Sequence, residues 1–143
     1  PDPDVEWAVE LGRTLEATAR RAEALDVFRR ASEMDAQSPL AWWHLGRALA
    51  EGGRDEEGEV AYRRALDLSA DFLPARMGLA ELLRKRGAVD EARAIYEAMQ
   101  RQADSALPGA INLAGLLVDC KQFDQAERVA RANLERHRDS PDL

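Results

Sequence analysis

The chain is poor in residues that build covalent or metal-bound frameworks. It has one cysteine, Cys120, which excludes an intrachain disulfide and a cysteine-based zinc cluster. Its two histidines, His44 and His137, share no metal-ligand spacing. No Gly-rich phosphate loop and no nucleophile elbow occurs in the sequence. We therefore predict a protein with no cofactor and no catalytic site, which is not an enzyme by itself.

Long apolar runs and an excess of basic charge are also missing. No apolar run approaches the roughly 20 residues of a membrane-spanning helix, so we expect no direct membrane insertion. The formal net charge is −7, which disfavours general binding to a phosphate backbone, so we expect no nucleic acid partner. Hydrophobic residues make up 45% of the chain, which is enough for a core, and 33% charged residues suit long solvated helix faces.

What the chain has instead is a 34-residue period. Leucines recur at two positions of it: Leu11, Leu45, Leu79 and Leu113, then Leu15, Leu49, Leu83 and Leu117. Small residues recur at two others: Gly12, Gly46, Ala80 and Ala114, then Ala24, Gly58, Ala92 and Ala126. An aromatic position holds Phe28, Tyr62 and Tyr96, with Ala130 as the exception. Four repeats follow without insertion, at 5–38, 39–72, 73–106 and 107–140.

Each repeat reads as two amphipathic helices joined by a short turn. In the second repeat, Ser38 is a helix N-cap, Pro39 follows at the first helical position, and Gly52-Gly53 ends the helix. First helices are expected near 5–18, 39–52, 73–86 and 107–120. Second helices are expected near 21–34, 55–68, 89–102 and 123–136.

Glycine inside a helix costs about 1 kcal/mol relative to alanine, so Gly46 needs a structural reason. Two helix axes come close only where the residues between them are small. We therefore expect Gly46 of the first helix to face Gly58 of the second. We expect Leu45 and Leu49 to pack against Tyr62 and the following hairpin.

Two spacings carry a resemblance to a known family: Trp42-x2-Leu45-Gly46 in a first helix, and Ala24-x3-Phe28-x2-Ala31 in a second helix. With the 34-residue period, they resemble the tetratricopeptide repeat. The resemblance covers residues 5–140. It implies an all-α fold, a right-handed superhelical solenoid of four helix-turn-helix hairpins forming a single array.

In that family the first helices line the concave face of the superhelix. Six positions of each first helix point inward, and this frame implies which residues meet a partner. The predicted partner-binding residues are Val9, Arg13, Trp43, His44, Arg47, Met77, Glu81, Ile111 and Asn112.

The fifth position of each repeat is apolar, and two interpretations of it stay open. Its residues are Val9, Trp43, Met77 and Ile111. Since Trp42 already fills the family's usual tryptophan position, we expect Trp43 to be solvent-accessible, unlike Trp42, and to anchor a partner. The alternative is that the fifth positions are half-buried and pack between adjacent repeats.

Two known binding modes of the family are not supported. Members that clamp the carboxylates of chaperone tails use Lys, Arg and Asn at five positions, which here hold Val9, Arg13, His44, Pro74 and Gly78. Members that bind peptide backbones repeat an asparagine at the sixth position, where only Asn112 fits.

The resemblance implies a non-catalytic protein–protein interaction or scaffold module that holds a partner peptide or small protein on its concave face. Because Glu6, Glu10 and Glu16 flank one end of the apolar positions and Arg84 and Lys85 the other, the partner segment should be amphipathic. Its basic residues should lie near the first repeat and its acidic residues near the third. One alternative is a structural array that self-associates through its C-terminal end. Another is the targeting domain of a larger enzyme.

The ends of the sequence favour a piece of a longer protein. Residue 1 is Pro instead of Met, and Ser140-Pro141 repeats Ser38-Pro39 in the correct register. We expect residues 1–4 and 141–143 to be edges of adjoining repeats. A cytoplasmic location is the default expectation.

Overall fold

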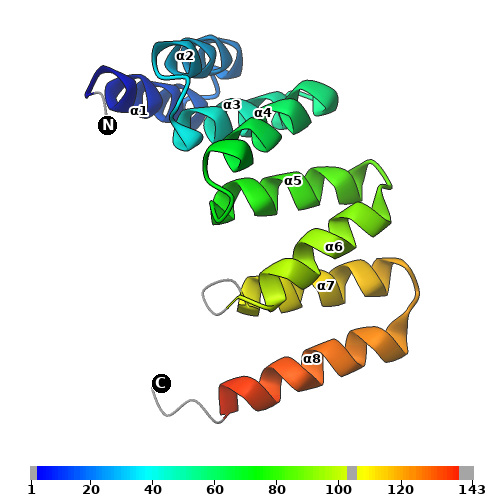
Figure 1. Cartoon of the computed structure of the whole chain (residues 1–143). Coiled ribbons are helices and arrows are strands. Elements are labelled where there is room, and N and C mark those ends of the chain that lie inside the picture. Colours follow the sequence, from blue (N-terminus) through cyan, green and yellow to red (C-terminus); the bar gives the residue numbers. More distant parts are fainter. Residues whose placement is uncertain (1–2, 103–105, 139–143) are drawn as a thin grey trace. The chain divides into compact units, whose positions relative to one another are not determined.

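A computed structural model describes residues 3–102 and 106–138, which form eight α-helices with no strand among them (Figure 1). The helices are α1 (Pro3–Ala17), α2 (Arg21–Met34), α3 (Pro39–Glu51), α4 (Asp55–Leu68), α5 (Leu73–Lys85), α6 (Val89–Gln100), α7 (Ala106–Asp119) and α8 (Phe123–Arg138). Six of them begin at the residue that the repeat frame predicts. The predicted all-α helix-turn-helix fold is confirmed. The superhelical hand of the whole array stays a prediction.

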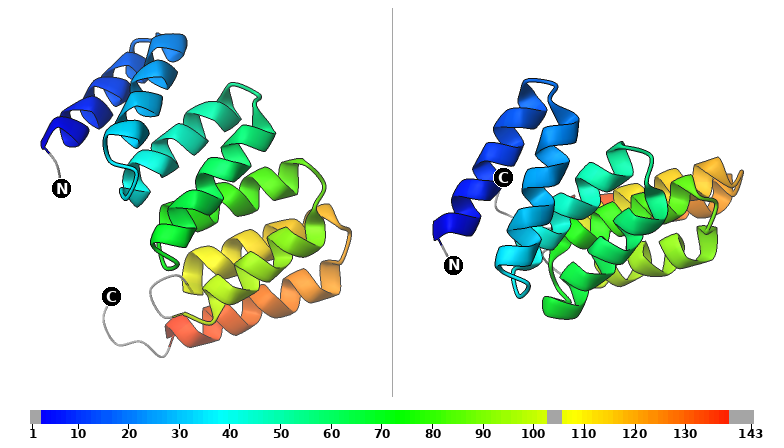
Figure 2. Two further views of the ribbon diagram at one scale, coloured as in Figure 1. Left: turned by 45° about the horizontal axis from the view of Figure 1, so that its top comes forward. Right: turned by 90° about the horizontal axis from the view of Figure 1, so that it is seen from above.

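The helices divide between two compact units, Pro1–Leu82 and Leu83–Leu143, called the N-terminal and C-terminal units below. In the N-terminal unit α1 packs on α2, α2 on α3, and α3 on α4. In the C-terminal unit α6 packs on α7 and α7 on α8. Figure 2 shows from two further sides that the two helices of a hairpin run antiparallel.

The close crossing of α3 and α4 depends on two glycines. A Cβ atom on Gly46 would lie 3.2 Å from the carbonyl oxygen of Gly58, and a Cβ atom on Gly58 would lie 3.0 Å from the oxygen of Gly46. The predicted contact of these glycines is confirmed. The Tyr62 ring fills the adjacent space, and it also lies against Gly78 of α5, where a Cβ atom would be 2.6 Å from the ring carbon Cζ. One aromatic side chain of α4 therefore contacts two consecutive first helices.

The leucines of α3 pack in the direction opposite to the expected one. Leu45 and Leu49 belong to a buried cluster with residues of the preceding hairpin and one residue of α4: Leu15, Ala24, Phe28 and Ala61. The expected packing on Tyr62 and the following hairpin is not part of this cluster. A first helix directs its leucines back toward the previous second helix, because the small positions of α3 already face α4.

The turns inside the hairpins share one backbone conformation. Ala19, Gly53, Gly87 and Lys121 have φ angles of 60°, 77°, 79° and 59°, and they lie 34 residues apart. A positive φ angle is nearly free for glycine and strained for residues with a side chain. The fold therefore imposes the same left-handed residue on every repeat, although only two repeats provide glycine.

The C-terminal unit repeats the same packing with larger departures. Tyr96 and Met99 of α6 are fully buried, and Gly109 of α7 lies so close that its Cβ atom would be 2.8 Å from that of Met99. In α8 the aromatic position holds Ala130, which is exposed. Asn133 stands where the first two repeats have alanine, and its buried Oδ1 atom has no hydrogen-bond partner.

Candidate functional site

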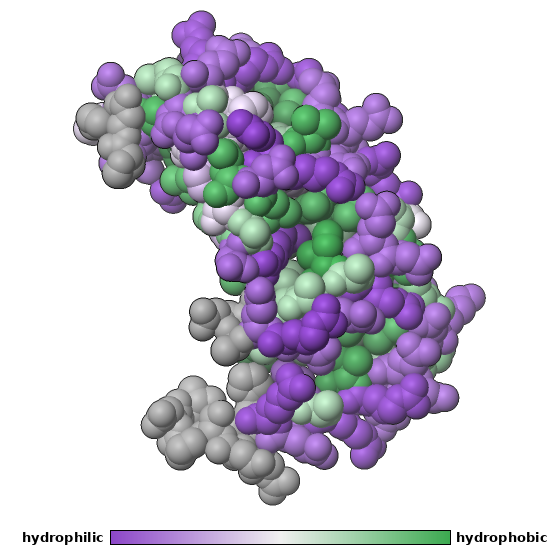
Figure 3. Space-filling model, viewed as in Figure 1, coloured by the Kyte–Doolittle hydropathy of each residue, from purple (hydrophilic) through white to green (hydrophobic). Residues whose placement is uncertain are grey.

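An open hollow of about 660 Å³ lies in the N-terminal unit between α1 and α3. Its lining residues are Glu10, Arg13, Thr14, Glu16, Ala17, Trp43, His44 and Arg47. Polar side chains cover most of the face of the molecule shown in Figure 3, with apolar side chains visible between them. The hollow, called the α1–α3 hollow below, thus combines charged walls with one indole.

Helical spacing brings these side chains together. Glu10, Arg13 and Ala17 follow one another at intervals of three and four residues on α1, and Trp43 and Arg47 are four residues apart on α3. Since these two first helices are consecutive in the 34-residue frame, corresponding faces of both helices meet at the hollow.

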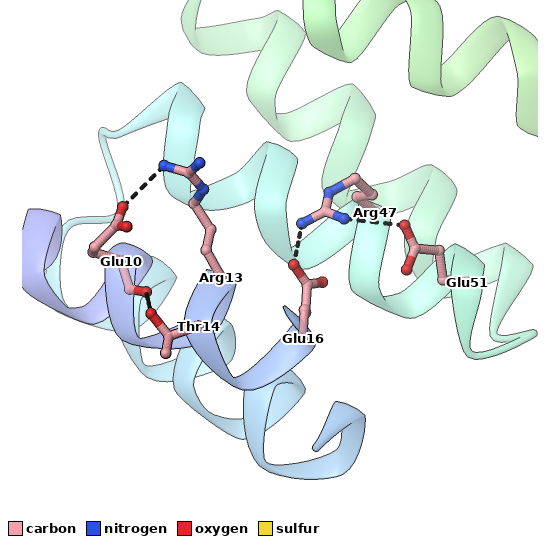
Figure 4. Close-up of polar contacts among 6 residues, drawn as sticks. All are labelled: Glu10, Arg13, Thr14, Glu16, Arg47 and Glu51. Atoms are coloured by element: carbon pink, nitrogen blue, oxygen red, sulfur yellow. Dashed lines mark hydrogen bonds and ion pairs between the residues drawn. The ribbon is translucent and has the colours of Figure 1, made fainter. Parts of the chain in front are cut away.

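Arg47 is the centre of a charge network that links the two hairpins (Figure 4). Its guanidinium donates hydrogen bonds to Glu16 of α1 and, at 3.0 Å, to Glu51 of α3. Burial alone would lower the pKa of Arg47, but the hydrogen bonds and charges of these two carboxylates outweigh it and raise the pKa. The guanidinium also lies over the Trp43 ring, 5.6 Å from its centroid. Arg47 is therefore fixed in place.

Arg13 and Glu10 form a second ion pair, at 2.9 Å, on the open rim of the hollow (Figure 4). Both side chains are more than half exposed. Exposed ion pairs contribute at most about 1 kcal/mol, because water screens them and the side chains lose freedom. Glu10 and Arg13 can thus exchange partners at little cost, in contrast to Arg47.

His44 is buried, with 5% of its surface exposed, and only contributes to the floor of the hollow. Its ring stacks on Phe28 with centroids 5.0 Å apart, and its Nδ1 atom has no hydrogen-bond partner. Burial, and then the charges of Arg47 and Arg13, lower the pKa of His44 to about 4. His44 is therefore neutral at pH 7. Its role as a partner-binding residue stays a prediction, since it lines the hollow but is largely buried.

Trp43 is half-buried, and so is Trp42, so the predicted difference in exposure between them is wrong. The two indoles differ in their contacts. Trp42 donates a hydrogen bond from Nε1 to the carbonyl oxygen of Ala36, at 3.0 Å, and packs against the buried leucine cluster. Trp43 meets Phe72 edge-on at 6.3 Å and faces the hollow. Of the two, only Trp43 is placed to touch a molecule in the α1–α3 hollow.

Val9 is buried in a cluster with Val5, Ala31 and Ala41. The fifth position of the first repeat therefore packs between hairpins, as the alternative interpretation held, and the prediction of Val9 as a contact residue is wrong. Met77 and Glu81 are exposed on α5, outside the lining of the hollow.

The two predicted residues of the C-terminal unit lie on α7. Ile111 is exposed, whereas Asn112 is half-buried and donates a hydrogen bond to the carbonyl oxygen of Pro108 at 3.0 Å. In the same unit, Arg84 in the last turn of α5 pairs with Asp119 of α7.

The sequence prediction named Glu10 and Glu16 as charges flanking the apolar positions but did not include them among the partner-binding residues. Glu10 and Glu16 occupy inward positions of the first helix, but their ion pairs with Arg13 and Arg47 were not foreseen. The ion pair of Glu16 with Arg47 could have been predicted from the sequence. The two residues are 31 positions apart, three fewer than the 34-residue period, so they lie about one helical turn from equivalent positions on consecutive first helices. Thr14 carried no such signal.

The described residues contain no candidate metal site and no candidate membrane-spanning helix. No group of three or more histidine, cysteine, aspartate or glutamate side chains there could hold a metal ion. Within residues 3–102 and 106–138, every helix is too short or too polar to cross a membrane.

Comparison with known proteins identifies the fold. Two family models, both described as tetratricopeptide repeat, match residues 9–72 and 58–108. Two crystal structures of MamA, at 21% and 20% identity, each have a TM-score of 0.83 and cover 99% of this chain and 79% and 84% of theirs. No curated protein sequence matches the chain.

Two further solved structures are similar. TTC0263, a thermophilic TPR protein of Thermus thermophilus, has a TM-score of 0.74 at 20% identity over 89% of this chain and 71% of its own. The first TPR of Spaghetti (RPAP3), bound to the HSP90 peptide SRMEEVD, has a TM-score of 0.76 at 14% identity over 85% of this chain and 96% of its own. Such repeats are typically non-enzymatic modules for protein–protein interaction. The matched models, the 34-residue hairpins and these structures show that the chain belongs to the tetratricopeptide repeat family.

Proposed function

We propose that the chain is a non-catalytic module that holds a segment of a partner protein in the α1–α3 hollow. The observation that carries the proposal is the joint presence of a half-buried indole and exchangeable charges in one open hollow. Trp43 provides an apolar contact whose neighbours, Phe72 and His44, already hold it in place. An anchor that is fixed before binding loses little entropy when a partner arrives.

The partner segment should present a basic residue beside an apolar one. Glu16 and Glu51 already neutralise Arg47, so the group that can accept a new cation is Glu10, after it releases Arg13. Glu6 is also exposed on α1 and adds negative charge near the same rim. A lysine or arginine of the partner would pair with Glu10, while its apolar neighbour rests on Trp43.

An acidic peptide such as the one bound to the similar RPAP3 repeat does not suit this hollow. That peptide, SRMEEVD, carries three acidic residues and one basic residue. In this chain, two of the five positions that clamp carboxylates in the family hold Val9 and His44, and both are buried. A neutral buried His44 offers no positive charge to a carboxylate.

A random peptide library displayed on phage tests the proposal directly. Peptides selected on the wild-type chain should be enriched in a basic residue next to an aromatic or aliphatic one. Trp43→Ala should weaken the binding of a selected peptide by about 2 kcal/mol or more. Glu10→Lys should weaken it further than Glu33→Lys, which changes the net charge equally but lies on α2, outside the hollow.

Two results would contradict the proposal. One is a selected set of peptides with net negative charge. The other is binding that Trp43→Ala leaves unchanged while the helical circular dichroism signal is retained. Because Trp43 is half-buried, each variant's thermal melt must be measured so that lost binding is not confused with lost folding.

A further inference from the structure

A second hollow, of about 310 Å³, opens on the N-terminal unit where α2 and α4 both pack on α3. Trp42, Leu45 and Leu49 of α3 form its floor, and Val60 and Ala61 of α4 form one wall. We call this hollow the α2–α4 groove. It shares no lining residue with the α1–α3 hollow, so it is a separate surface that the proposed function leaves unused.

Val60 gives the groove an apolar edge that the other repeats lack. The equivalent residues are Asp26 in the first repeat and Ala94 in the third. Val60 has 67% of its surface exposed, so it adds little to the stability of the fold. A branched apolar side chain beside the indole of Trp42 is, however, the kind of lining that receives an apolar side chain of a ligand.

Trp42 presents its ring and not its polar atom to the groove. Its Nε1 atom already donates a hydrogen bond to the carbonyl oxygen of Ala36, at 3.0 Å. The indole is therefore held in place before any partner arrives, and an anchor fixed in advance loses little entropy on binding. Beneath it, Leu45 and Leu49 are buried and belong to the core of the unit.

The two rims of the groove carry opposite charges. On the α2 rim, Arg29 is 42% exposed, and its ion pair with Asp26 is long, at 4.0 Å. On the α4 rim, Arg54 holds Glu57 at 2.6 Å, whereas Glu56 makes no ion pair with any described residue. The hydrogen bond from Arg54 is the main cause that lowers the pKa of Glu57, and the charge of Arg29 on the other rim adds to it. The groove thus offers one acid without a partner and one weakly paired base.

The size of the groove suits a side chain carried on a longer segment. Pockets that enclose small molecules have volumes of about 300–1,000 Å³ and bury most of the ligand. The α2–α4 groove, at about 310 Å³, lies at the lower end of this range and is open to solvent between two helices. One large side chain fills such a space while the backbone that carries it stays outside, between the charged rims.

We propose that the α2–α4 groove binds a segment of a partner protein that carries one large apolar side chain between an acidic and a basic residue. The apolar side chain enters the groove between Trp42 and Val60. The basic residue pairs with Glu56, and the acidic residue pairs with Arg29. The chain then holds partner segments on two separate surfaces, and this site does not depend on the function proposed for the α1–α3 hollow.

Sorting of peptides selected from a phage-displayed random library tests this site in the full chain. Peptides bound in the groove should lose affinity about tenfold or more on Val60→Asp and keep it on Glu10→Lys, which alters the α1–α3 hollow. Val60→Asp introduces the residue type that the first repeat has at this exposed position, so the thermal melt should be unchanged. Val118→Asp, at an exposed valine of α7, is the matched control and should leave binding unchanged.

Charge reversal tests the two rims separately. For a peptide bound in the groove, Glu56→Lys should weaken binding about fivefold, and a glutamate in place of the peptide's basic residue should restore it. Arg29→Glu should weaken binding to a similar extent, and a lysine in place of the peptide's acidic residue should restore it. Glu135→Lys changes the net charge as Glu56→Lys does, but on an exposed residue of α8, and should have little effect.

Four outcomes would overturn the proposal. The first is the absence of any peptide that loses affinity on Val60→Asp and keeps it on Glu10→Lys. The second is a loss of affinity on Val118→Asp equal to that on Val60→Asp. The third is charge reversal that no exchanged peptide rescues. The fourth is a mass that rises with concentration from 15.9 kDa and returns to it in Val60→Asp, which would assign the groove to a second copy of the chain.

The same sorting keeps the two sites apart. Peptides that lose affinity on Glu10→Lys but not on Val60→Asp support the α1–α3 hollow, and a set made only of such peptides overturns the groove. A set with the reverse behaviour supports the groove and counts against the hollow. Each proposal can therefore fail while the other stands.

Discussion

The first two hairpins of the chain share one sequence register but treat several of its positions differently. Leu11 of α1 is exposed, whereas Leu45 at the same position of α3 is buried. Trp7 stands where α3 has Ala41, and Val9 is buried where Trp43 lies at the hollow. The register thus determines the direction in which a side chain points, and the neighbouring helix determines whether that side chain becomes core or surface.

The difference in neighbouring helices also separates the residues that stabilise the N-terminal unit from the residues proposed to contact a partner in the α1–α3 hollow. α3 lies between α2 and α4, so its apolar residues stabilise the fold on two sides. α1 has α2 on one side, and Trp7, Leu11 and the Glu10–Arg13 ion pair remain accessible. The peptide contact proposed for this hollow therefore involves exposed residues of α1, while α2, α3 and α4 each contribute several buried residues to the N-terminal unit.

The largest expected difference between the hairpins is in the cost of removing the repeated leucine. Leu45→Ala should lower the free energy of unfolding by about 2–5 kcal/mol, because it leaves a cavity in the buried cluster. Leu11→Ala should change it by no more than about 0.5 kcal/mol, because the side chain is exposed. Urea unfolding of both variants at low protein concentration measures the two values. Equal costs would mean that α1 is covered in solution.

The second expected effect is the contribution of His44 on α3 to the pH dependence of stability. His44 has a pKa of about 4 in the folded chain, below the ordinary value of 6.5. Between these pH values the unfolded chain binds a proton that the folded chain does not, so stability falls as the pH is lowered. The 2.5-unit difference corresponds to about 3 kcal/mol, fully developed below about pH 4.

His44→Phe, which keeps a ring against Phe28, provides the matched control for this effect. Urea unfolding of wild type and variant is measured between about pH 7 and pH 4, and the carboxylate contributions common to both chains cancel in the difference. The wild type should lose stability relative to the variant as the pH falls. Parallel curves would show that His44 is accessible to protons in the folded chain.

The third effect concerns the close crossing of α3 and α4. Gly46→Leu should destabilise the chain by about 1–3 kcal/mol, because the new side chain meets both the Tyr62 ring and the Gly58 backbone. Gly115→Leu on α7 is the matched control, since nothing lies within 4 Å of a Cβ atom there. It should be neutral or stabilising by up to about 1 kcal/mol, because glycine disfavours a helix. Thermal unfolding midpoints distinguish the two, and an unchanged midpoint for Gly46→Leu would contradict the assignment of Gly46 to the crossing.

The register alone was sufficient to predict the helices and the contact of Gly46 with Gly58. It does not distinguish Leu11 from Leu45, because burial at this position depends on a neighbouring helix that no residue of α1 encodes. The predicted difference in exposure between Trp42 and Trp43 was wrong, since both are half-buried. Their difference is in their partners, Ala36 for one and Phe72 for the other.

The candidate site was predictable only in part for a similar reason. Arg13, Trp43 and Arg47 follow from the family's inward positions, and the structure brings them together. Val9 and His44 occupy inward positions too, but Ala41 and Phe28 of other helices bury them. Position in a repeat predicts an orientation, whereas accessibility depends on the volume of side chains up to 34 residues away.

The smallest expected effect compares the turns of the first two hairpins, where Ala19 and Gly53 have φ angles of 60° and 77°. Ala19→Gly should stabilise the chain by about 1 kcal/mol, because glycine adopts this backbone conformation without the strain of a Cβ atom. Gly53→Ala should destabilise it by a similar amount through strain alone, since nothing lies within 4 Å of its Cβ position. Ala22→Gly, at an exposed position inside α2, should lower stability by about 1 kcal/mol and shows that the gain at Ala19 is specific to the turn. Unfolding midpoints of the three variants decide the comparison, and a loss of stability in Ala19→Gly would mean that the first turn does not share the backbone conformation of the second.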